Sequence, residues 1–130
     1  MGEFLRQARC FLFDLDGTIY LGKRLLPGAR EFLTYLGETD FPYFFLTNNS
    51  SRSRADYVEK LARFGLYTPA ENIFTSGEAT AIYLHKRHPK ARIYLVGTPS
   101  LEDEFARFGF DLTDHDPDFV VLGFDTCLLY

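Results

Sequence analysis

The stretch Cys-Phe-Leu-Phe-Asp-Leu-Asp-Gly-Thr at residues 10–18 begins as a continuous apolar run and ends in two aspartates and a glycine before Thr18. A second apolar run, residues 41–46, is followed by Thr-Asn-Asn at 47–49. Runs that are apolar on both faces are typical of parallel strands buried under helices. The two runs therefore predict strands of one parallel sheet, each with polar residues at its carboxyl end.

The segments that follow these two runs have helical signals. Between them, apolar residues recur at i, i+3, i+4 and i+7, with Pro27 suited to the first helical position and Gly37 to the helix end. Ser53 and Asp56 predict a capping box at the start of the next helix, which Gly65 would end. Strand, helix and strand in this order predict a βαβ unit.

The alternation continues toward the carboxyl end of the chain. The elements expected there are a strand at 72–75, a helix at 75–88, a strand at 92–96, a helix at 98–108 and a strand at 119–122. The first of these helices carries Ala79, Ile82 and Tyr83, and Thr98 is expected to cap the second. The pattern predicts an α/β fold with a parallel sheet, and Pro89 as the boundary between two parts, residues 1–89 and 90–130.

Composition limits the classes of protein to which the chain can belong. Its 130 residues are 46% apolar and 17% aromatic, which is enough for a hydrophobic core. The net charge of -4 comes from acidic and basic residues that are interspersed along the chain. A nucleic-acid-binding protein would need a clustered basic face, so we expect no nucleic-acid partner.

The sequence also predicts the compartment. No window approaches the ~20 apolar residues of a membrane span, and residues 1–9 lack the apolar stretch of a signal peptide. Cys10 and Cys127 lie in or beside apolar runs, so we expect reduced thiols in a cytoplasmic protein, with a disulfide between them as the alternative.

Asp14 and Asp16 are the first candidates for chemistry. They follow the first predicted strand, and residues i and i+2 of an extended segment project to the same side. Two carboxylates so close favour a bound Mg²⁺, with one acting as nucleophile toward phosphorus and the other as proton donor. Two solvated aspartates in a turn are the alternative. A calcium-binding EF-hand is excluded, because its sixth and twelfth positions would be Ile19 and Leu25.

The second candidate is Thr-Asn-Asn-Ser at residues 47–50, at the end of the second predicted strand and before a helix. A hydroxyl and backbone N–H groups near a helix N-terminus can hold a phosphoryl oxygen. A polar loop with a helix cap is the alternative. Both candidates lie at the edge of the sheet where parallel α/β proteins bind ligands.

Several motifs together resemble one known family. They are Phe-Asp-Leu-Asp-Gly-Thr-Ile-Tyr-Leu-Gly at 13–22, Leu-Pro-Gly-Ala at 26–29, Phe-Leu-Thr-Asn-Asn-Ser-Ser-Arg at 45–52, Thr-Ser-Gly-Glu-Ala at 75–79, Leu-Val-Gly-Thr-Pro at 95–99 and Pro-Asp-Phe-Val-Val-Leu-Gly-Phe-Asp at 117–125. The chain resembles the haloacid dehalogenase-like superfamily, in its NagD or 4-nitrophenylphosphatase branch. The resemblance implies a Rossmann-like parallel sheet with helices on both faces, of which residues 1–89 are the amino-terminal part.

The resemblance also implies roles for single residues. Asp14 would form an aspartyl-phosphate and bind Mg²⁺, while Asp16 would be the general acid and base, with its backbone carbonyl on the metal. The groups implied to hold the phosphoryl group are the amides of Leu15 and Asp16, Thr47 and the backbone of Asn48, and Asn49 is expected to contact the substrate. Hydrolysis of small phosphate monoesters through this intermediate is the implied activity.

Residues 90–130 look like the first part of the α/β cap that this branch inserts. A cap excludes bulk water and large substrates, which favours a small phosphorylated metabolite as the partner. A homo-oligomer formed through the cap is a further option.

The family also needs a lysine and an acidic pair on strands that follow the cap. The sequence ends inside the apparent cap, so we expect hydrolysis to need residues beyond 130. The alternative is a truncated, catalytically incompetent module that binds phosphate or a phosphorylated ligand without turnover. We further expect the first strand to lie at an unpaired edge of the sheet. A signalling receiver domain is a weaker rival, because the third strand ends in Phe-Thr-Ser at 74–76 and not in an aspartate.

Overall fold

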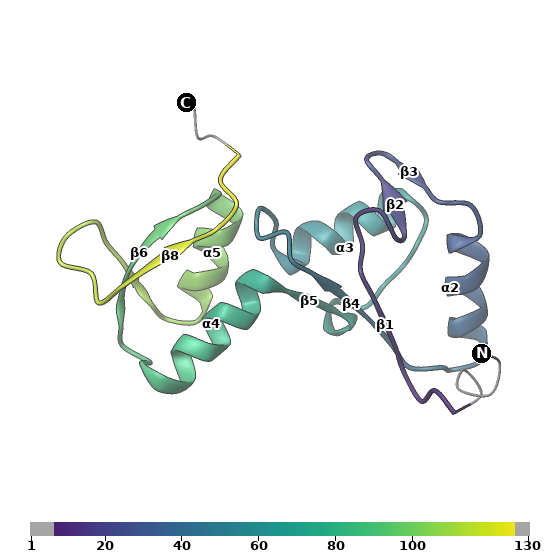
Figure 1. Ribbon diagram of the computed structural model, residues 1–130, viewed down its shortest axis with the longest axis horizontal. Coiled ribbons are helices and arrows are strands. Elements are labelled where there is room, and N and C mark those ends of the chain that lie inside the picture. Colours follow the sequence, from purple (N-terminus) through teal and green to yellow (C-terminus); the bar gives the residue numbers. More distant parts are fainter. Residues whose placement is uncertain (1–6, 127–130) are drawn as a thin grey trace.

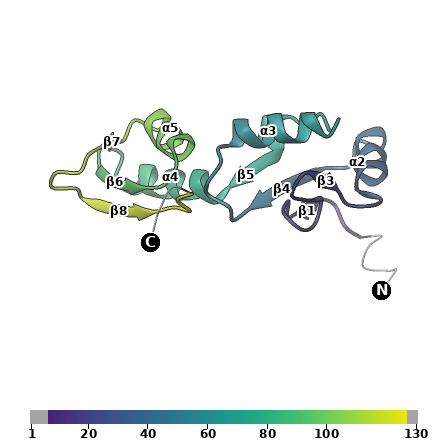
Figure 2. The ribbon, with the colours of Figure 1, turned by 90° about the horizontal axis from the view of Figure 1, so that it is seen from above.

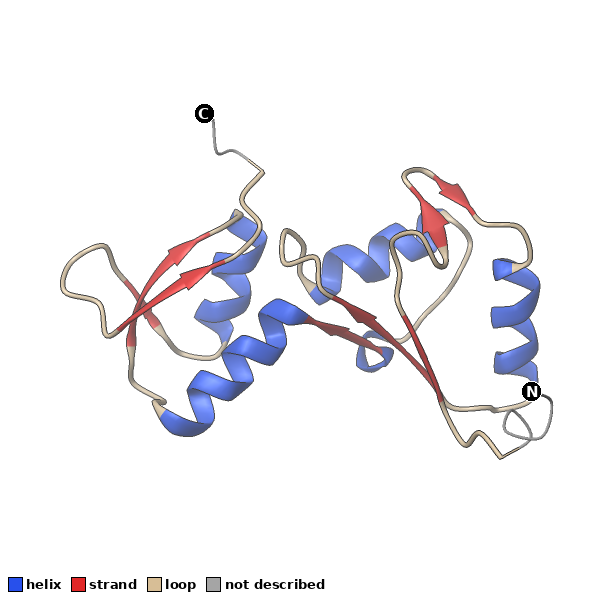
Figure 3. Cartoon of the chain, in the orientation of Figure 1, coloured by secondary structure: helices blue, strands red, loops and turns tan. Residues whose placement is uncertain are grey.

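The computed structural model describes residues 7–126, so Cys127 and its predicted thiol state lie outside the described residues, while Cys10 is exposed and unbridged. The elements, coloured by type in Figure 3, are β1 (Phe11–Phe13), β2 (Tyr20–Leu21), β3 (Arg24–Leu25), α2 (Ala29–Glu38), β4 (Tyr43–Thr47), α3 (Arg54–Arg63), a 3-10 turn (Ala70–Asn72), β5 (Ile73–Thr75), α4 (Ser76–Arg87), β6 (Arg92–Val96), α5 (Pro99–Arg107), β7 (Asp111–Leu112) and β8 (Phe119–Leu122). The predicted α/β class is confirmed.

The first sheet has the strand order β1-β4-β5, and both pairings are parallel. Phe13 lies opposite Phe45, and Thr47 opposite Thr75. Among residues 7–126, β1 therefore has no strand on its outer side, as the sequence predicts. The register brings the carboxyl ends of the three strands to one edge.

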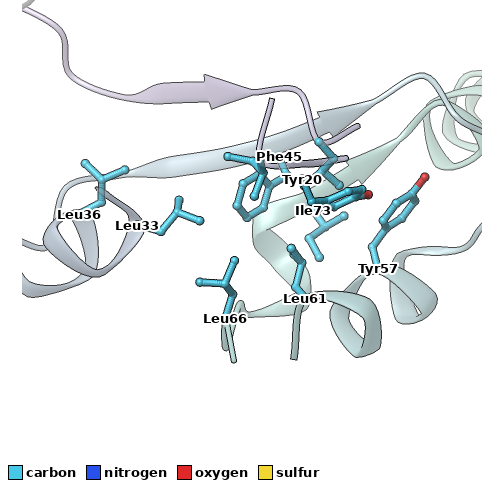
Figure 4. Close-up of a cluster of buried hydrophobic side chains, with 10 residues drawn as sticks. Tyr20, Leu33, Leu36, Phe45, Tyr57, Leu61, Leu66 and Ile73 are labelled. Atoms are coloured by element: carbon cyan, nitrogen blue, oxygen red, sulfur yellow. The ribbon is translucent and has the colours of Figure 1, made fainter. Parts of the chain in front are cut away.

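One face of this sheet is buried under α2 and α3, which Figure 2 shows on one side of the strands. Figure 4 shows the core that results: Tyr20, Leu33, Leu36, Phe45, Tyr57, Leu61, Leu66 and Ile73 form one cluster. On the opposite face the side chains of β1, β4 and β5 are exposed. They are Leu12, Phe44, Leu46 and Phe74. In the described part of the chain, helices thus cover one face of the first sheet.

The helix ends follow the sequence signals in some places and depart from them in others. The capping box of α3 is confirmed, because Ser53 and Asp56 exchange both hydrogen bonds. The start predicted for α2 is wrong: Gly28 is its N-cap with a φ of 81°, so Pro27 lies before the helix. Gly37 is not the stop either, since the helix continues to Glu38.

A hairpin of two-residue strands, β2 and β3, is a feature that periodicity does not predict. Tyr20 pairs with Leu25 and Leu21 with Arg24, so the loop is only two residues long. Its first residue, Gly22, has a φ of 60°, which suits a tight hairpin turn and disfavours other residues. The turn places Lys23 at the hairpin tip.

The second sheet has the order β7-β6-β8 with parallel pairings, and it packs with α4 and α5. On α4, Tyr83 is exposed while Ala81 and Leu84 are buried. The reason is that α4 turns its apolar side toward α5 and the second cluster of buried residues. We therefore call residues 7–75 the first unit and residues 76–126 the second unit, which lie at opposite ends of Figure 1. The boundary predicted at Pro89 lies after α4.

Candidate active site

Three strand ends of the first sheet meet around one cavity of about 380 Å³. Asp14 follows β1, Thr47 ends β4 with Asn48 next to it, and Ser76 follows β5. All four line this cavity. The parallel register explains the gathering, because it brings these carboxyl ends to the same edge. The structure thus brings together the two candidate segments that the sequence singles out.

Asp14 is exposed at this cavity, and its carboxylate has no hydrogen-bond or ion-pair partner within residues 7–126. The backbone carbonyl of Asp16 likewise accepts no hydrogen bond from that part of the chain. Unpartnered carboxylate and carbonyl oxygens are the ligands that Mg²⁺ prefers, so these two groups fit the implied metal. No cluster of three or more His, Cys, Asp or Glu with metal-binding spacing occurs among the described residues, so the donor set is partial.

The side chain of Asp16 is held by two neighbours. The Tyr20 hydroxyl donates to its Oδ2 at 3.3 Å, and Lys60 Nζ lies 3.6 Å from its Oδ1. Lys60 also lies over the Tyr20 ring, 3.7 Å from the centroid. Burial, with Asp16 beside it, raises the pKa of Tyr20 well above its ordinary value, so the hydroxyl stays a donor. Asp16 is therefore oriented by fixed groups.

The loop after β4 is ordered by its own polar groups. Thr47 is buried, and its Oγ1 accepts from the Asn49 amide at 3.2 Å and lies 3.4 Å from the Tyr57 hydroxyl. Asn49 Oδ1 accepts from the Ser51 amide at 3.0 Å and from the Ser51 hydroxyl at 2.7 Å. The side-chain oxygen of Asn49 is thus engaged, and Asn49 is not among the residues that line the cavity, so its predicted contact with the substrate stays a prediction.

Leu15 can contribute to a phosphate site only through its backbone. Its side chain is fully buried, and its carbonyl accepts from the amides of Thr18, Ile19 and Tyr20. This tight turn fixes the direction of the peptide units between Asp14 and Asp16. The roles predicted for the amides of Leu15 and Asp16 stay predictions.

The same loop is also bonded to the second unit. Ser76 Oγ donates to the Asn48 carbonyl at 3.1 Å, Thr98 Oγ1 donates to the Ser51 carbonyl at 3.0 Å, and the Phe124 amide donates to Ser50 Oγ at 2.8 Å. Thr98 is the N-cap residue of α5, yet its side chain makes no capping hydrogen bond, which corrects the predicted cap. Its hydroxyl is used for the contact between units instead.

A buried ionic cluster joins the two units. Arg54 at the start of α3 pairs with Glu78 of α4, and Glu104 of α5 accepts from the Thr75 hydroxyl at 3.4 Å. Burial, and then the charge of Glu78, raises the pKa of Glu104, while Thr75 and Arg54 act in the opposite direction. Gly77 permits this contact, because a Cβ there would lie 2.7 Å from Glu104 Oε2. The Arg54 guanidinium thus pairs with Glu78 directly and acts on Glu104 through its charge.

Replacing Glu104 with Gln is expected to raise the melting temperature at pH 7 by ~4 °C, since the substitution removes a buried negative charge. The unfolded chain protonates this group near its ordinary pKa of 4.5, and the folded chain does so at a higher pH. The gain should therefore vanish below about pH 4.5, where Glu104 is neutral in both states. Thermal melts across pH measure it, with the exposed Glu102→Gln as the control. An equal gain in both variants would contradict the role of burial.

Three residues of this region were not predicted from the sequence. Ser76 lies in a segment interpreted only as a helix start, although its position after a strand was a usable signal. Lys60 and Tyr57 lie on α3, and their approach to Asp16 and Thr47 depends on how that helix packs. No local pattern in the sequence encodes that approach.

Comparisons with known proteins find one family throughout. A sequence model of the haloacid dehalogenase-like hydrolases matches residues 11–111. The acid sugar phosphatase of Staphylococcus epidermidis is 32% identical over 127 residues, which are 97% of this chain and 49% of that protein. The chain therefore spans about half the length of the curated relatives it matches.

Solved structures give the same result. The 4-nitrophenylphosphatase of Thermotoga maritima superposes with a TM-score of 0.91 at 46% identity, covering 97% of this chain and 48% of that one. NagD of E. coli K-12 superposes with a TM-score of 0.83 at 32% identity, covering 94% and 48%. The fold and the sequence thus agree on the same relatives.

Proposed function

The chain belongs to the haloacid dehalogenase-like hydrolases, and from that premise we propose that it serves Mg²⁺-dependent hydrolysis of small phosphate monoesters through an aspartyl-phosphate. The observation that carries the proposal is the unpartnered carboxylate of Asp14 in a cavity shared with Thr47 and Asn48. The matched relatives are named as phosphatases, which supports the same chemistry. Within this family the nucleophile alone does not fix the reaction.

In this proposal Asp14 attacks the phosphorus atom, and Thr47 with the backbone of Asn48 holds the phosphoryl oxygens. Asp16 gives a proton to the leaving oxygen and later takes one from water. Tyr20 and Lys60 keep the Asp16 carboxylate in place between these steps. Mg²⁺, held by Asp14 and the backbone carbonyl of Asp16, would neutralise charge between carboxylate and phosphate.

A phosphate-binding module without turnover is the second candidate. It concerns residues 1–130 alone, among which the lysine and the acidic pair that the family resemblance implies are not found. We propose that full activity needs those groups from residues beyond 130. The two candidates share the phosphoryl cavity and differ only in the step after binding.

The test is release of phosphate from 4-nitrophenyl phosphate by a protein that continues beyond residue 130, with Mg²⁺ or with a chelator, next to binding of inorganic phosphate by calorimetry. The proposed function predicts binding together with release that stops on chelation. Binding without any release would establish the module instead. A chain that does neither would exclude both candidates.

Replacing Lys60 with Met is expected to raise Mg²⁺ affinity about threefold at low salt, because a positive charge beside Asp16 repels the metal. A Mg²⁺ titration by calorimetry measures the change, and ~1 M salt should reduce it. Lys86→Met is the matched control, since that lysine is exposed on α4. An unchanged or weaker affinity in the Lys60 variant would contradict a metal near Asp16.

Further parts of the proposal concern the surroundings of the site. None of the helices in residues 7–126 is long and apolar enough to cross a membrane. We propose a cytoplasmic protein, in which residues 90–130 begin a cap over the site and a small phosphorylated metabolite is the partner. The hydrogen bonds from Thr98 and Phe124 to the loop after β4 support that position of the cap. A homo-oligomer through the cap is part of the same proposal.

A further inference from the structure

A second cleft, of about 660 Å³, lies between the β2–β3 hairpin and α3. It is distinct from the phosphoryl cavity, with which it shares no lining residue. Its charged lining consists of Lys23, Arg52, Asp56, Glu59, Lys60 and Arg63. The proposed reaction does not require a ligand in this cleft.

Most of these charges already have partners. Glu59 pairs with Arg63 at 2.6 Å, and Asp56 Oδ2 accepts from the Ser53 amide at 2.8 Å. Lys60 forms an ion pair with Asp16. Lys23 and Arg52 are left, and neither forms an ion pair or hydrogen bond within residues 7–126. The unpaired charge of the cleft is therefore positive.

The electrostatics around Arg52 show that its charge reaches into the cleft. Arg52 and Lys60 line the same cleft. The charge of Arg52 also acts on Asp56. Burial raises the pKa of the Asp56 carboxyl, but the Ser53 hydrogen bonds and Arg52 together hold this pKa below its ordinary value. Two neighbouring cations that repel one another are stabilised when an anion lies between them.

Lys60 also shows that the cleft lies next to the proposed proton donor, Asp16. Its Nζ contacts the Asp16 carboxylate, and the same side chain forms part of the cleft wall. Asp16 is the proposed proton donor to the leaving oxygen, so the alcohol part of the ester leaves on this side. A group attached to that alcohol can reach the cleft.

We propose that this cleft binds a carboxylate carried by the alcohol part of the phosphate ester, with Arg52 and Lys23 as its ligands. The inference rests on the proposed function and narrows its substrate class to phosphorylated carboxylic acids. The planar guanidinium of Arg52 matches a carboxylate through two parallel hydrogen bonds. Lys23 adds a second charge from the tip of the hairpin, where the turn at Gly22 holds it.

The test compares two esters that differ mainly in the carboxylate, 3-phosphoglycerate and glycerol 3-phosphate. Their dissociation constants are measured by calorimetry on the full chain with Mg²⁺, in the Asp14→Asn background so that no aspartyl-phosphate forms. 3-Phosphoglycerate is expected to bind about tenfold more tightly. Adding Arg52→Gln should reduce the preference to about twofold or less, without changing the affinity for glycerol 3-phosphate.

Arg63→Gln is the matched control, because Arg63 lines the same cleft but is paired with Glu59. It should keep the preference, and both variants should melt like the parent, since both arginines are exposed. Glycerate, which lacks phosphate, should bind at least about tenfold more weakly than 3-phosphoglycerate.

The outcomes distinguish failure of the carboxylate site from failure of the proposed phosphatase function. Equal binding of both esters by the chain with Arg52 intact, equal losses in the Arg52 and Arg63 variants, or glycerate bound as tightly as 3-phosphoglycerate would each overturn the inference alone. Failure of both esters to bind to the chain with Asp14 intact would overturn the proposed function, and the inference with it.

Discussion

In a protein that continues beyond residue 130, phosphate release is expected to fall at least ~10³-fold when Asp14 is replaced by Asn, to the level of the buffer. The amide keeps the size of the side chain but lacks the nucleophilic oxygen and the negative charge that would attract Mg²⁺. Asp14 is exposed and has no partner among the described residues, so its loss removes no contact within that part of the fold. Release from 4-nitrophenyl phosphate measures the effect, and the melting temperature is expected to stay within ~2 °C of wild type.

Asp40→Asn is the control for Asp14→Asn, because Asp40 is also an exposed aspartate but lies after α2 at the other end of the strands. It should leave release unchanged. Equal release by wild type and the Asp14 variant would show that another group, or another protein in the sample, performs the hydrolysis. Loss of release together with loss of fold would assign Asp14 a structural role instead.

Replacing Arg54 with Met is expected to destabilise the chain by about 3 kcal/mol, or ~10 °C in melting temperature. The substitution removes the cation that pairs with Glu78 and whose charge also lowers the pKa of Glu104, and both carboxylates are largely buried. Glu78 Oε2 already lacks a hydrogen-bond partner among the described residues, so it cannot recruit a neighbour there. The loss should shrink at acidic pH, where Glu104 is neutral.

Two further variants test whether the loss of stability in the Arg54 variant comes from the buried carboxylates. Glu78→Gln combined with Arg54→Met should recover about half of the loss, because one buried charge is then removed. Arg63→Met removes a cation from the same helix, but its pair with Glu59 is mostly exposed, so we expect a change below about 0.5 kcal/mol. Equal losses at Arg54 and Arg63 would mean that the loss reflects helix propensity and not the buried cluster.

The sequence predicted the strands well because their apolar runs are long enough to be read locally. The expected strand at 92–96 and the strand at 119–122 match β6 and β8 to the residue. The hairpin of β2 and β3 was missed, because two-residue strands show no periodicity and only Gly22 marks the turn. The start of α2 was misplaced because Pro27 suits a turn before a helix as well as its first position.

In the candidate site, the sequence predicted the polar residues at the strand ends. It did not predict the side chains of other elements that contact these residues. Asp14, Thr47 and Asn48 share a cavity because parallel strands end at one edge, which local patterns can predict. Lys60 reaches Asp16 only through the packing of α3 on the sheet, and Arg54 reaches Glu78 across the junction of the two units. Contacts of this kind depend on tertiary geometry, which a single sequence does not contain.

The loop that follows Thr47 belongs to both units, and this sharing has a thermodynamic consequence. Its carbonyls and the Ser50 hydroxyl accept hydrogen bonds from Ser76, Thr98 and Phe124, which move with the second unit. A rotation of that unit must stretch these bonds or carry the loop along. Binding in the phosphoryl cavity and the orientation of the second unit then depend on each other. A ligand that favours one orientation of the second unit is bound more tightly when the unit is held in that orientation.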